Sequence, residues 1–344
     1  ILLFILSTSF CKAQQHKFDS LKLLLIKTKN PEKRAKLLID IAKSIYYSIP
    51  DSSIGYCEQA EEISKKNNLE VQLAYSLNCE CRYLLLKGDI KTSIEKINQS
   101  ITLFEKHNEL NGLAKAYSQK SIALGKLNNS TEKIVYLYKA KDIYSKLNDK
   151  PGIVSVLSNL ANTYISHNQY SLALKALDEC ALLNLPKSGD EFFVELNYGN
   201  VFFGLDDQEK AISHYKKAIE VAHQFKMLDS EITGLTNLAE SYLKQKNISE
   251  SKNTYLKALQ LAKENNLMVE ESDALKGMTD LFELEEDYKN AFLSLKKYKT
   301  IQDSILNVEK VKSINNIEHK LQLTEKEKII TQQSLSLEKE KVAL

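Results

Sequence analysis

The sequence is short of the residues that break helices. Its 344 residues include only 10 Gly, 4 Pro and no Trp. Gly and Pro are the least favourable residues inside a helix, so their scarcity agrees with long helical stretches. An excess of charge of one sign is also lacking, because 47 basic residues face 45 acidic ones. A chain with this balance has no net field that would draw nucleic acid or an anionic membrane, so we expect no nucleic-acid partner for this segment.

The sequence also lacks the local motifs of common active sites. It has no Gly-rich phosphate loop, no paired-His zinc spacing and no Gly-x-Ser-x-Gly nucleophile elbow. The six His residues are scattered, and none pairs with Cys or carboxylates at metal-ligand spacing. His319 lacks the surroundings of a phosphoacceptor and is expected to be an exposed structural residue. We therefore expect no enzyme activity, no cofactor and no metal site in this chain.

What the sequence does have is a repeat with a period of 40 residues, shortened to 38 once. Each repeat has a small residue, a large apolar one three positions later and another small one twelve positions later, which lets two antiparallel helices touch closely. The first small residues, here called the marker column, are Cys81, Ser121, Ala161, Gly199, Ala239 and Thr279. Twelve positions later lie Ser93, Lys133, Ala173, Ala211, Ser251 and Ala291, of which only Lys133 departs from the rule.

Residues 157–181 show the unit most clearly, as two short amphipathic helices joined by a polar turn. Ala161, Tyr164 and Ala173 occupy positions where the tetratricopeptide repeat (TPR) has a small residue, a Tyr and an Ala, so the unit resembles that family. The period exceeds the common TPR length by about six residues, which we assign to longer helices. The predicted fold is all-α: a right-handed α-solenoid of about seven TPR-like helical hairpins, followed by a long C-terminal helix.

The order of segments predicts three parts. Residues 1–13, an apolar run that ends in Cys11-Lys12-Ala13, are interpreted as the remnant of a signal peptide, with a buried N-terminal helix as the alternative. Residues 14–299 form the TPR superhelix, of which residues 14–67 are a degenerate N-terminal capping unit. Residues 300–344 contain no Gly or Pro and predict a long helix, with a heptad pattern that favours a coiled coil and a homodimer through this segment.

The cysteines allow two interpretations. Cys57 and Cys81 fall on helices that should be neighbours, and export would permit a disulfide between them. Free Cys is among the most buried residue types, so two buried thiols are the simpler expectation. The sequence alone leaves the choice open.

A set of polar side chains, mostly amides, indicates a binding surface. They lie two residues before the marker and one residue after it, so they share one face of each first helix. An amide both donates and accepts hydrogen bonds, which suits the backbone of an extended peptide, and the TPR resemblance implies that first helices line a concave groove. The equal alternative is that these side chains only hydrogen-bond neighbouring helices. The predicted groove residues are Gln119, Asn159, Asn162, Asn197, Asn200, Asn237 and Glu240, with Phe193, Phe203, Leu243 and Lys244 setting side-chain preference.

The whole layout resembles the exported TPR sensor region of bacterial membrane-bound histidine kinases or helix-turn-helix regulators. The resemblance implies a module that binds a peptide or protein in its concave groove on the periplasmic or extracytoplasmic side of the inner membrane. It also implies that the chain meets the membrane only through a segment beyond Leu344, where an output domain would follow. No kinase or DNA-binding residue occurs in the chain, so no output activity carries over. A free periplasmic TPR scaffold or assembly factor and a structural coiled-coil oligomeriser are the alternative functions.

Overall fold

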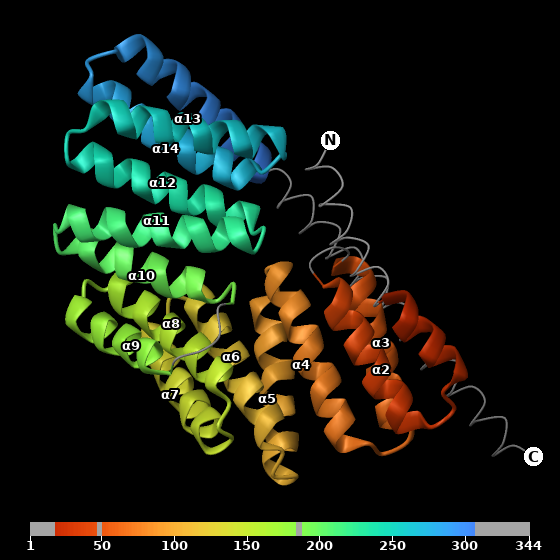
Figure 1. Cartoon of the computed structure of the whole chain (residues 1–344). Coiled ribbons are helices and arrows are strands. Elements are labelled where there is room, and N and C mark those ends of the chain that lie inside the picture. Colours follow the sequence, from red (N-terminus) through yellow and green to blue (C-terminus); the bar gives the residue numbers. More distant parts are fainter. Residues whose placement is uncertain (1–17, 47–49, 184–187, 307–344) are drawn as a thin grey trace, which may run out of the picture. The chain divides into compact units, whose positions relative to one another are not determined.

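The structure of the chain is a computed structural model that describes residues 18–46, 50–183 and 188–306. Within these ranges all regular secondary structure is helical, which confirms the predicted all-α class (Figure 1). Two helices span residues 18–27 and 288–306. The others are α2 (Pro31–Ile45), α3 (Pro50–Lys66), α4 (Glu70–Leu86), α5 (Ile90–Lys106), α6 (Leu110–Lys126), α7 (Ser130–Lys146), α8 (Lys150–Ser166), α9 (Tyr170–Leu182), α10 (Glu191–Gly204), α11 (Gln208–Gln224), α12 (Leu228–Lys244), α13 (Ile248–Glu264) and α14 (Met268–Leu284).

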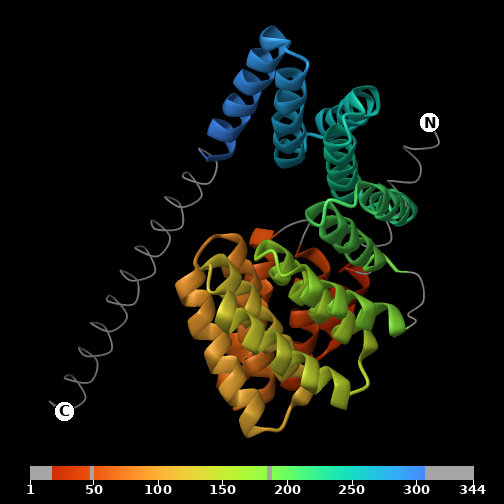
Figure 2. The same cartoon turned by 90° about the vertical axis from the view of Figure 1, so that its left-hand side faces the viewer.

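The helices belong to two compact units, Ile1–Phe225 and Lys226–Leu344 (Figures 1 and 2). In the first unit every helix from α2 to α11 packs against the next one along the chain. In the second unit α12 packs on α13 and α13 on α14. Each sequence repeat is therefore one antiparallel hairpin, and each unit is a stack of TPR-like hairpins, as predicted. The right hand of the superhelix stays a prediction.

The turns between helices recur as regularly as the helices. A non-Gly residue with positive φ ends most helices, for example Asn128 with a φ of 57°. Together with Gly88, which also has positive φ, these residues recur every 20 residues from Asn68 to Asn168, and again from Asp206 to Glu286. Gly and Asn are the residues that best tolerate the left-handed conformation, which explains why Asn is common at this position. The half-repeat of the fold is thus one helix and one short turn.

The turn after α6 shows how these connections are held. The Asn128 N–H donates to the Gly125 carbonyl at 3.0 Å, and the Asn129 N–H donates to the Leu124 carbonyl at 3.0 Å. These are the two bonds of a Schellman motif, which satisfies the last carbonyls of a helix. Asn129 then caps α7, because its side-chain oxygen accepts from the Glu132 N–H at 3.2 Å. Two adjacent residues therefore end one helix and start the next.

The predicted small-residue columns lie where paired helices touch. All six marker residues are buried. In the column twelve positions later, Ser93 Oγ donates to the Cys81 carbonyl at 3.0 Å, and Ser251 Oγ donates to the Ala239 carbonyl at 2.8 Å. A Ser in this column therefore buries no unpaired hydroxyl and instead ties the second helix to the backbone of the first. The degenerate unit has the same link, from Ser53 Oγ to the Ala42 carbonyl at 2.9 Å.

Two positions in these columns depart from the common pattern. Lys133 is only half-buried, and its stem passes Gly125, where a Cβ would lie 3.3 Å from Lys133 Cδ. Burial lowers the pKa of the Lys133 amine. Another column of large residues lies sixteen positions after the marker. In it Leu295, on the helix over residues 288–306, is 39% exposed, whereas Tyr255 of the previous repeat is 1% exposed. The column is therefore less covered in the last described hairpin.

A charged cluster is buried between α3, α4 and α5. Lys96 Nζ lies 2.5 Å from Glu80 Oε2 and 3.1 Å from Glu61 Oε2, so one ammonium serves two carboxylates. Glu80 Oε1 is buried and has no hydrogen-bond partner within the described chain. Burial and the Glu61 carboxylate raise the pKa of Glu80 to about 8, against the attraction of Lys96. The pKa of Glu61 is lowered despite its own burial, because it bonds with Glu80, Lys65 and Lys96.

The four cysteines in the described ranges, Cys57, Cys79, Cys81 and Cys180, are free and buried. Cys57 packs in one cluster with Ala42 and Cys79. Cys81 lies in a different cluster and donates from Sγ to the Asn78 carbonyl at 3.0 Å. Residues two apart on a helix project to different sides, so only Cys79 faces Cys57. The bridge between Cys57 and Cys81 considered from the sequence is not formed.

Several predictions concern residues outside the described ranges. The signal remnant at residues 1–13, His319 and the coiled coil beyond residue 306 are among them. Residues 300–306 continue the helix that begins at residue 288. In the described part of the chain, every helix is too short or too polar to cross a lipid bilayer.

We predict that Glu80→Gln changes how stability depends on pH. The pKa of Glu80 rises from 4.5 to about 8 on folding, so the folded chain binds this proton more tightly than the unfolded chain. The free energy of unfolding should therefore fall as the pH rises through this window, and Gln, which cannot ionise, should abolish a fall on the order of 3 kcal/mol. Urea unfolding at about pH 5 and about pH 8 measures the difference, with Glu58→Gln, an exposed change on α3, as the control. The same pH dependence in Glu80→Gln and the wild type would contradict the prediction.

Candidate peptide-binding surfaces

The first helices of successive hairpins form an inner layer. In the first unit α2 contacts α4, α4 contacts α6 and α8 contacts α10, and in the second unit α12 contacts α14. The predicted groove residues lie on these helices. Those from Gln119 to Phe203 belong to the first unit, and those from Asn237 to Lys244 belong to the second. Each unit therefore presents its own candidate surface.

Asn197 and Asn200 on α10 both make hydrogen bonds inside the protein. Asn197 is 7% exposed, and its Nδ2 donates to the Ser158 carbonyl on α8 at 3.1 Å. Asn200 Oδ1 accepts from the Tyr215 hydroxyl on α11 at 2.8 Å. These amides hold α10 against its neighbours, which is the alternative role that the sequence allowed for them.

The other predicted residues of the first unit are more accessible. Asn159 is half-buried and donates to the Ser155 carbonyl of its own helix at 2.8 Å, and Asn162 is exposed. Phe193 is 46% exposed, with its ring edge-on to Phe192 at a centroid distance of 5.1 Å. Phe203 is half-buried. Gln119 differs from these, because it lines a groove together with residues of α2 and α4.

The inner faces of α2, α4 and α6 enclose this groove, here called the N-terminal groove. It has a larger part of about 700 Å³ and a smaller part of about 280 Å³, which share Lys43, Tyr75 and Lys115. The larger part carries both signs of charge, and all four of its carboxylates are engaged. Glu70 pairs with Lys106 and His107, and Asp40 Oδ1 lies 3.8 Å from Lys43 Nζ. The Tyr75 hydroxyl donates to Glu109 at 2.8 Å, and Gln72 Nε2 donates to Glu32 at 2.9 Å. Ile39 and Val71 add apolar surface.

The smaller part, here called the cationic end, is lined by Lys43, Arg82 and Lys115 together with Asn78 and Gln119, and by no carboxylate. Each cation comes from a different helix, α2, α4 and α6. Burial and then the nearby Lys43 ammonium lower the pKa of Lys115, against the attraction of Asp149, Glu109 and Asp40. Such a site can accept an anionic group and hydrogen-bond the amide groups beside it.

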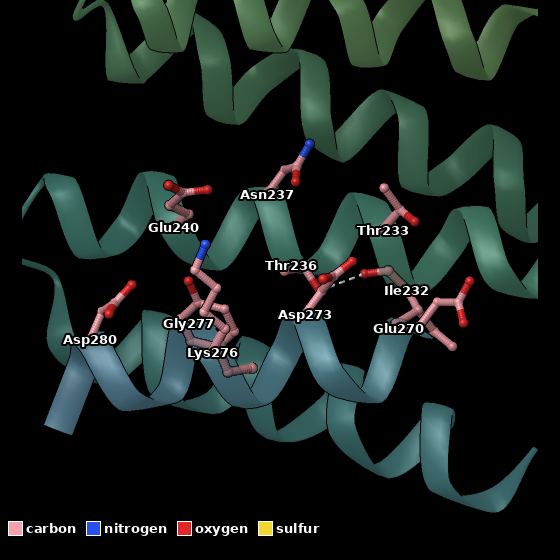
Figure 3. Close-up of a pocket in the computed structure, with 11 residues that line it drawn as sticks. Ile232, Thr233, Thr236, Asn237, Glu240, Glu270, Asp273, Lys276, Gly277 and Asp280 are labelled. Carbon is pink, nitrogen blue, oxygen red and sulfur yellow. Dashed lines mark hydrogen bonds between the residues drawn. The ribbon is translucent and has the colours of Figure 1, made fainter. Parts of the chain in front are cut away.

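In the second unit, Asn237 and Glu240 line a pocket of about 240 Å³ between α12 and α14, here called the acidic pocket (Figure 3). Figure 3 shows both side chains projecting from α12, opposite Lys276 and Asp280 on α14. Leu243 is half-buried and Lys244 is exposed, and neither lines this pocket. Half of the residues predicted in this unit therefore come together in one site.

The sequence also contains a charge pattern that marks the two candidate sites, and the pattern of amides does not include it. The column one residue after the marker, extended to the degenerate unit, contains Lys43, Arg82, Ile122, Asn162, Asn200, Glu240 and Asp280. Cations occupy its first two positions, neutral residues the next three and carboxylates the last two. Charge along this column, more than amide content, marks the two candidate sites.

Comparison with known sequences supports the repeat assignment. Residues 190–264 match the sequence model described as the tetratricopeptide repeat. No curated protein matches the chain. The matched span runs through α10, α11, α12 and α13, so this part of the chain consists of tetratricopeptide repeats, and the other described hairpins have the same build.

Solved structures of similar fold include the apo form of the quorum sensor NprR from B. thuringiensis, with 16% identity and a TM-score of 0.60 over 87% of this chain and 84% of that chain. The Rap conjugation gene regulator of plasmid pLS20, in complex with a Phr peptide, has 17% identity and a TM-score of 0.59 over 78% and 73%. Aspartyl phosphate phosphatase F from Bacillus subtilis has 14% identity and a TM-score of 0.57 over 72% and 68%. Similarity at these identities establishes a shared fold.

We predict that Asn197→Ala destabilises the first unit. The change removes the hydrogen bond that joins α10 to the Ser158 carbonyl of α8, and a buried bond of this kind contributes roughly 1 kcal/mol. Urea unfolding measures the loss. Asn162→Ala, the matched change at an exposed amide on α8, should alter stability by less than about 0.5 kcal/mol. Equal effects of the two substitutions would remove the structural role assigned to Asn197.

Proposed function

We propose that this chain is a protein- or peptide-binding TPR module whose N-terminal groove holds an extended peptide segment that carries a carboxylate. The observation that carries the proposal is the cationic end. Lys43, Arg82 and Lys115 converge there from three successive first helices, around a cavity with no lining carboxylate. The proposal assigns binding and no catalytic step.

The groove has the parts that peptide recognition requires. A carboxylate at the cationic end would form charge-assisted hydrogen bonds, which are stronger than neutral ones. Asn78 and Gln119 offer donors and acceptors for the peptide backbone, whatever its side chains. The larger part of the groove continues from this point and offers Ile39, Val71 and Tyr75 as contacts for neighbouring side chains. An extended segment with an acidic group at one end would therefore meet a complementary surface.

The fold comparisons support a binding role. One solved protein of similar fold is a regulator in complex with a peptide, and another is a quorum sensor. In this chain the groove is lined by the first helices of successive hairpins, which supports peptide binding there. The small size of the groove suits a short or extended segment better than a folded domain.

We propose further that the chain is the exported sensory region of a bacterial signal-transduction protein. An apolar run that ends at Cys11-Lys12-Ala13 supports export, because it has the form of a signal peptide followed by a cleavage site. The regulatory roles named for the two similar structures support the sensory part of this proposal.

The peptide-binding proposal is tested with peptides selected from a random heptapeptide library displayed with free C-termini. We expect selected peptides to be rich in Asp and Glu, or to need their free carboxylate. A Lys43→Ala, Lys115→Ala double variant should raise the dissociation constant, measured by fluorescence anisotropy, at least tenfold. Lys126→Ala removes an exposed charge from the last turn of α6, outside the groove, and should leave the constant unchanged. Failure to select any peptide, or equal binding by all three proteins, would overturn the proposal.

The export proposal predicts the N-terminus of the mature protein. If cleavage follows Ala13, the chain isolated from its source should begin at Gln14 and be found on the extracytoplasmic side. Intact mass and N-terminal sequencing of the isolated protein measure this. A mature chain that retains residues 1–13 would contradict export by this signal.

A further inference from the structure

The acidic pocket has an excess of negative charge that its own residues leave uncompensated. Its walls carry the carboxylates Glu240, Glu270, Asp273 and Asp280, with Lys276 as the one lining cation. Among the described residues, none of these five side chains has an oppositely charged group within 4.0 Å. Figure 3 shows Glu240 and Asp280 at one end of the pocket and Glu270 towards the other.

The surroundings of two of these carboxylates make their charged forms less favourable. Burial beside α14 and then the Asp280 carboxylate raise the pKa of Glu240, while Lys276 and Lys244 offset only part of the effect. Burial also raises the pKa of Asp273. Two carboxylates that face each other across a partly desolvated site are stabilised by a cation that enters between them.

A tyrosine whose side chain is almost fully buried also lines the pocket. Tyr255 from α13 is 1% exposed, and its hydroxyl makes no hydrogen bond with any described residue. Tyr215, one repeat earlier in the same column, donates to Asn200 at 2.8 Å. The residue that corresponds to Asn200 is Glu240, which does not form this bond to Tyr255. The Tyr255 hydroxyl therefore has no partner within the described part of the fold and can hydrogen-bond a ligand or water in the pocket.

The backbone of α14 leaves room for this hydroxyl. Gly277 lies two residues before the marker, where α8, α10 and α12 carry Asn. A Cβ at Gly277 would overlap Cζ and the hydroxyl oxygen of Tyr255. The Gly thus opens the pocket to the Tyr255 side chain and also removes an amide that would fill it. The absence of a side chain at Gly277 therefore lets Tyr255 reach the same pocket as the charged residues.

We infer that the acidic pocket binds the guanidinium or ammonium group of a basic peptide side chain. A guanidinium presents its N–H donors in a planar fork that matches carboxylates on two sides, so Arg fits better than Lys. The Tyr255 hydroxyl supplies an acceptor for one of the remaining donors. The described residues contain no cluster of three or more His, Cys, Asp or Glu placed to hold a metal ion, which favours an organic cation. That the cation belongs to a peptide rests on the function proposed above.

The first experiment uses a small probe, so that it does not depend on peptide binding. N-acetyl-arginine N-methylamide is titrated into the full chain and followed by heteronuclear NMR, in parallel with the citrulline analogue, which has the same shape and no charge. We expect saturable shifts confined to α12, α14 and Tyr255 for the arginine probe, with at least tenfold weaker binding of the citrulline probe. Equal responses to the two probes would overturn the inference.

Variants test whether the carboxylates are responsible. The Glu240→Gln, Asp280→Asn double variant keeps the size of both side chains and should weaken the arginine probe at least tenfold. Tyr255→Phe, which removes only the hydroxyl, should weaken it severalfold. Glu283→Gln removes a charge from an exposed position of α14 outside the pocket and should bind like the wild type. Unchanged binding by the double variant, with a circular dichroism melting curve like that of the wild type, would overturn the inference.

Further arms separate the source of the cation from the proposed function. Glycine N-methylamide presents a free backbone amine, and stronger binding of this probe than of the arginine probe would overturn the side-chain assignment. A capped heptapeptide with one central Arg should bind more tightly than the arginine probe alone. If the arginine probe binds but no peptide improves on it, the peptide function fails and the cation site stands. If peptides bind and the arginine probe does not, the cation site fails and the peptide function stands.

Discussion

Paired helices in this chain approach closely because small residues lie where they cross. Ala161 on α8 and Ala173 on α9 are fully buried, and most other repeats place Ala, Ser, Cys or Gly at the same two positions. A larger side chain at such a crossing would overpack it, at a cost of roughly 1–3 kcal/mol. Where the second position is Ser, its hydroxyl bonds the backbone of the partner helix and keeps the crossing tight. The hairpins, and the stack built from them, depend on this contact.

The short turns convert that contact into a regular inner surface. Most helices end at a residue with positive φ, and the following residue often caps the next helix. Because helix and turn together span a constant length, a given column returns to the same face in every repeat. The residue after the marker therefore lies on the inner layer each time, whatever its side chain. The backbone thus fixes the position of this surface, and the side chains of the column determine its charge and hydrogen-bonding groups.

The sequence predicted the parts of the structure that are local and repeated. Helical class, hairpins and the small-residue columns follow from spacing, and in the degenerate unit the small residues Ala42 and Ala60 are likewise fully buried. Features set by contacts between helices were harder to predict. Asn197 looks like a groove residue in its own repeat, and only the position of Ser158 one repeat earlier reveals its bond. The packing of Cys57 beside Cys79 also depends on how α3 and α4 are rotated about their axes, which sequence spacing does not give.

The acidic pocket occurs where the column one residue after the marker no longer forms a hydrogen bond within the described fold. At Asn200 the inner column closes a hydrogen bond with Tyr215, so both side chains are used within the fold. One repeat later the same two positions hold Glu240 and Tyr255, and no such bond forms between them. The carboxylate is left facing Asp280, and the hydroxyl is left facing the pocket. An array that is stable through its crossings tolerates such substitutions, because the small-residue contacts at Ala239 and Ser251 remain intact. In a repeat protein of this kind, a departure from the structural residue of an inner column is thus a physical reason to look for a ligand.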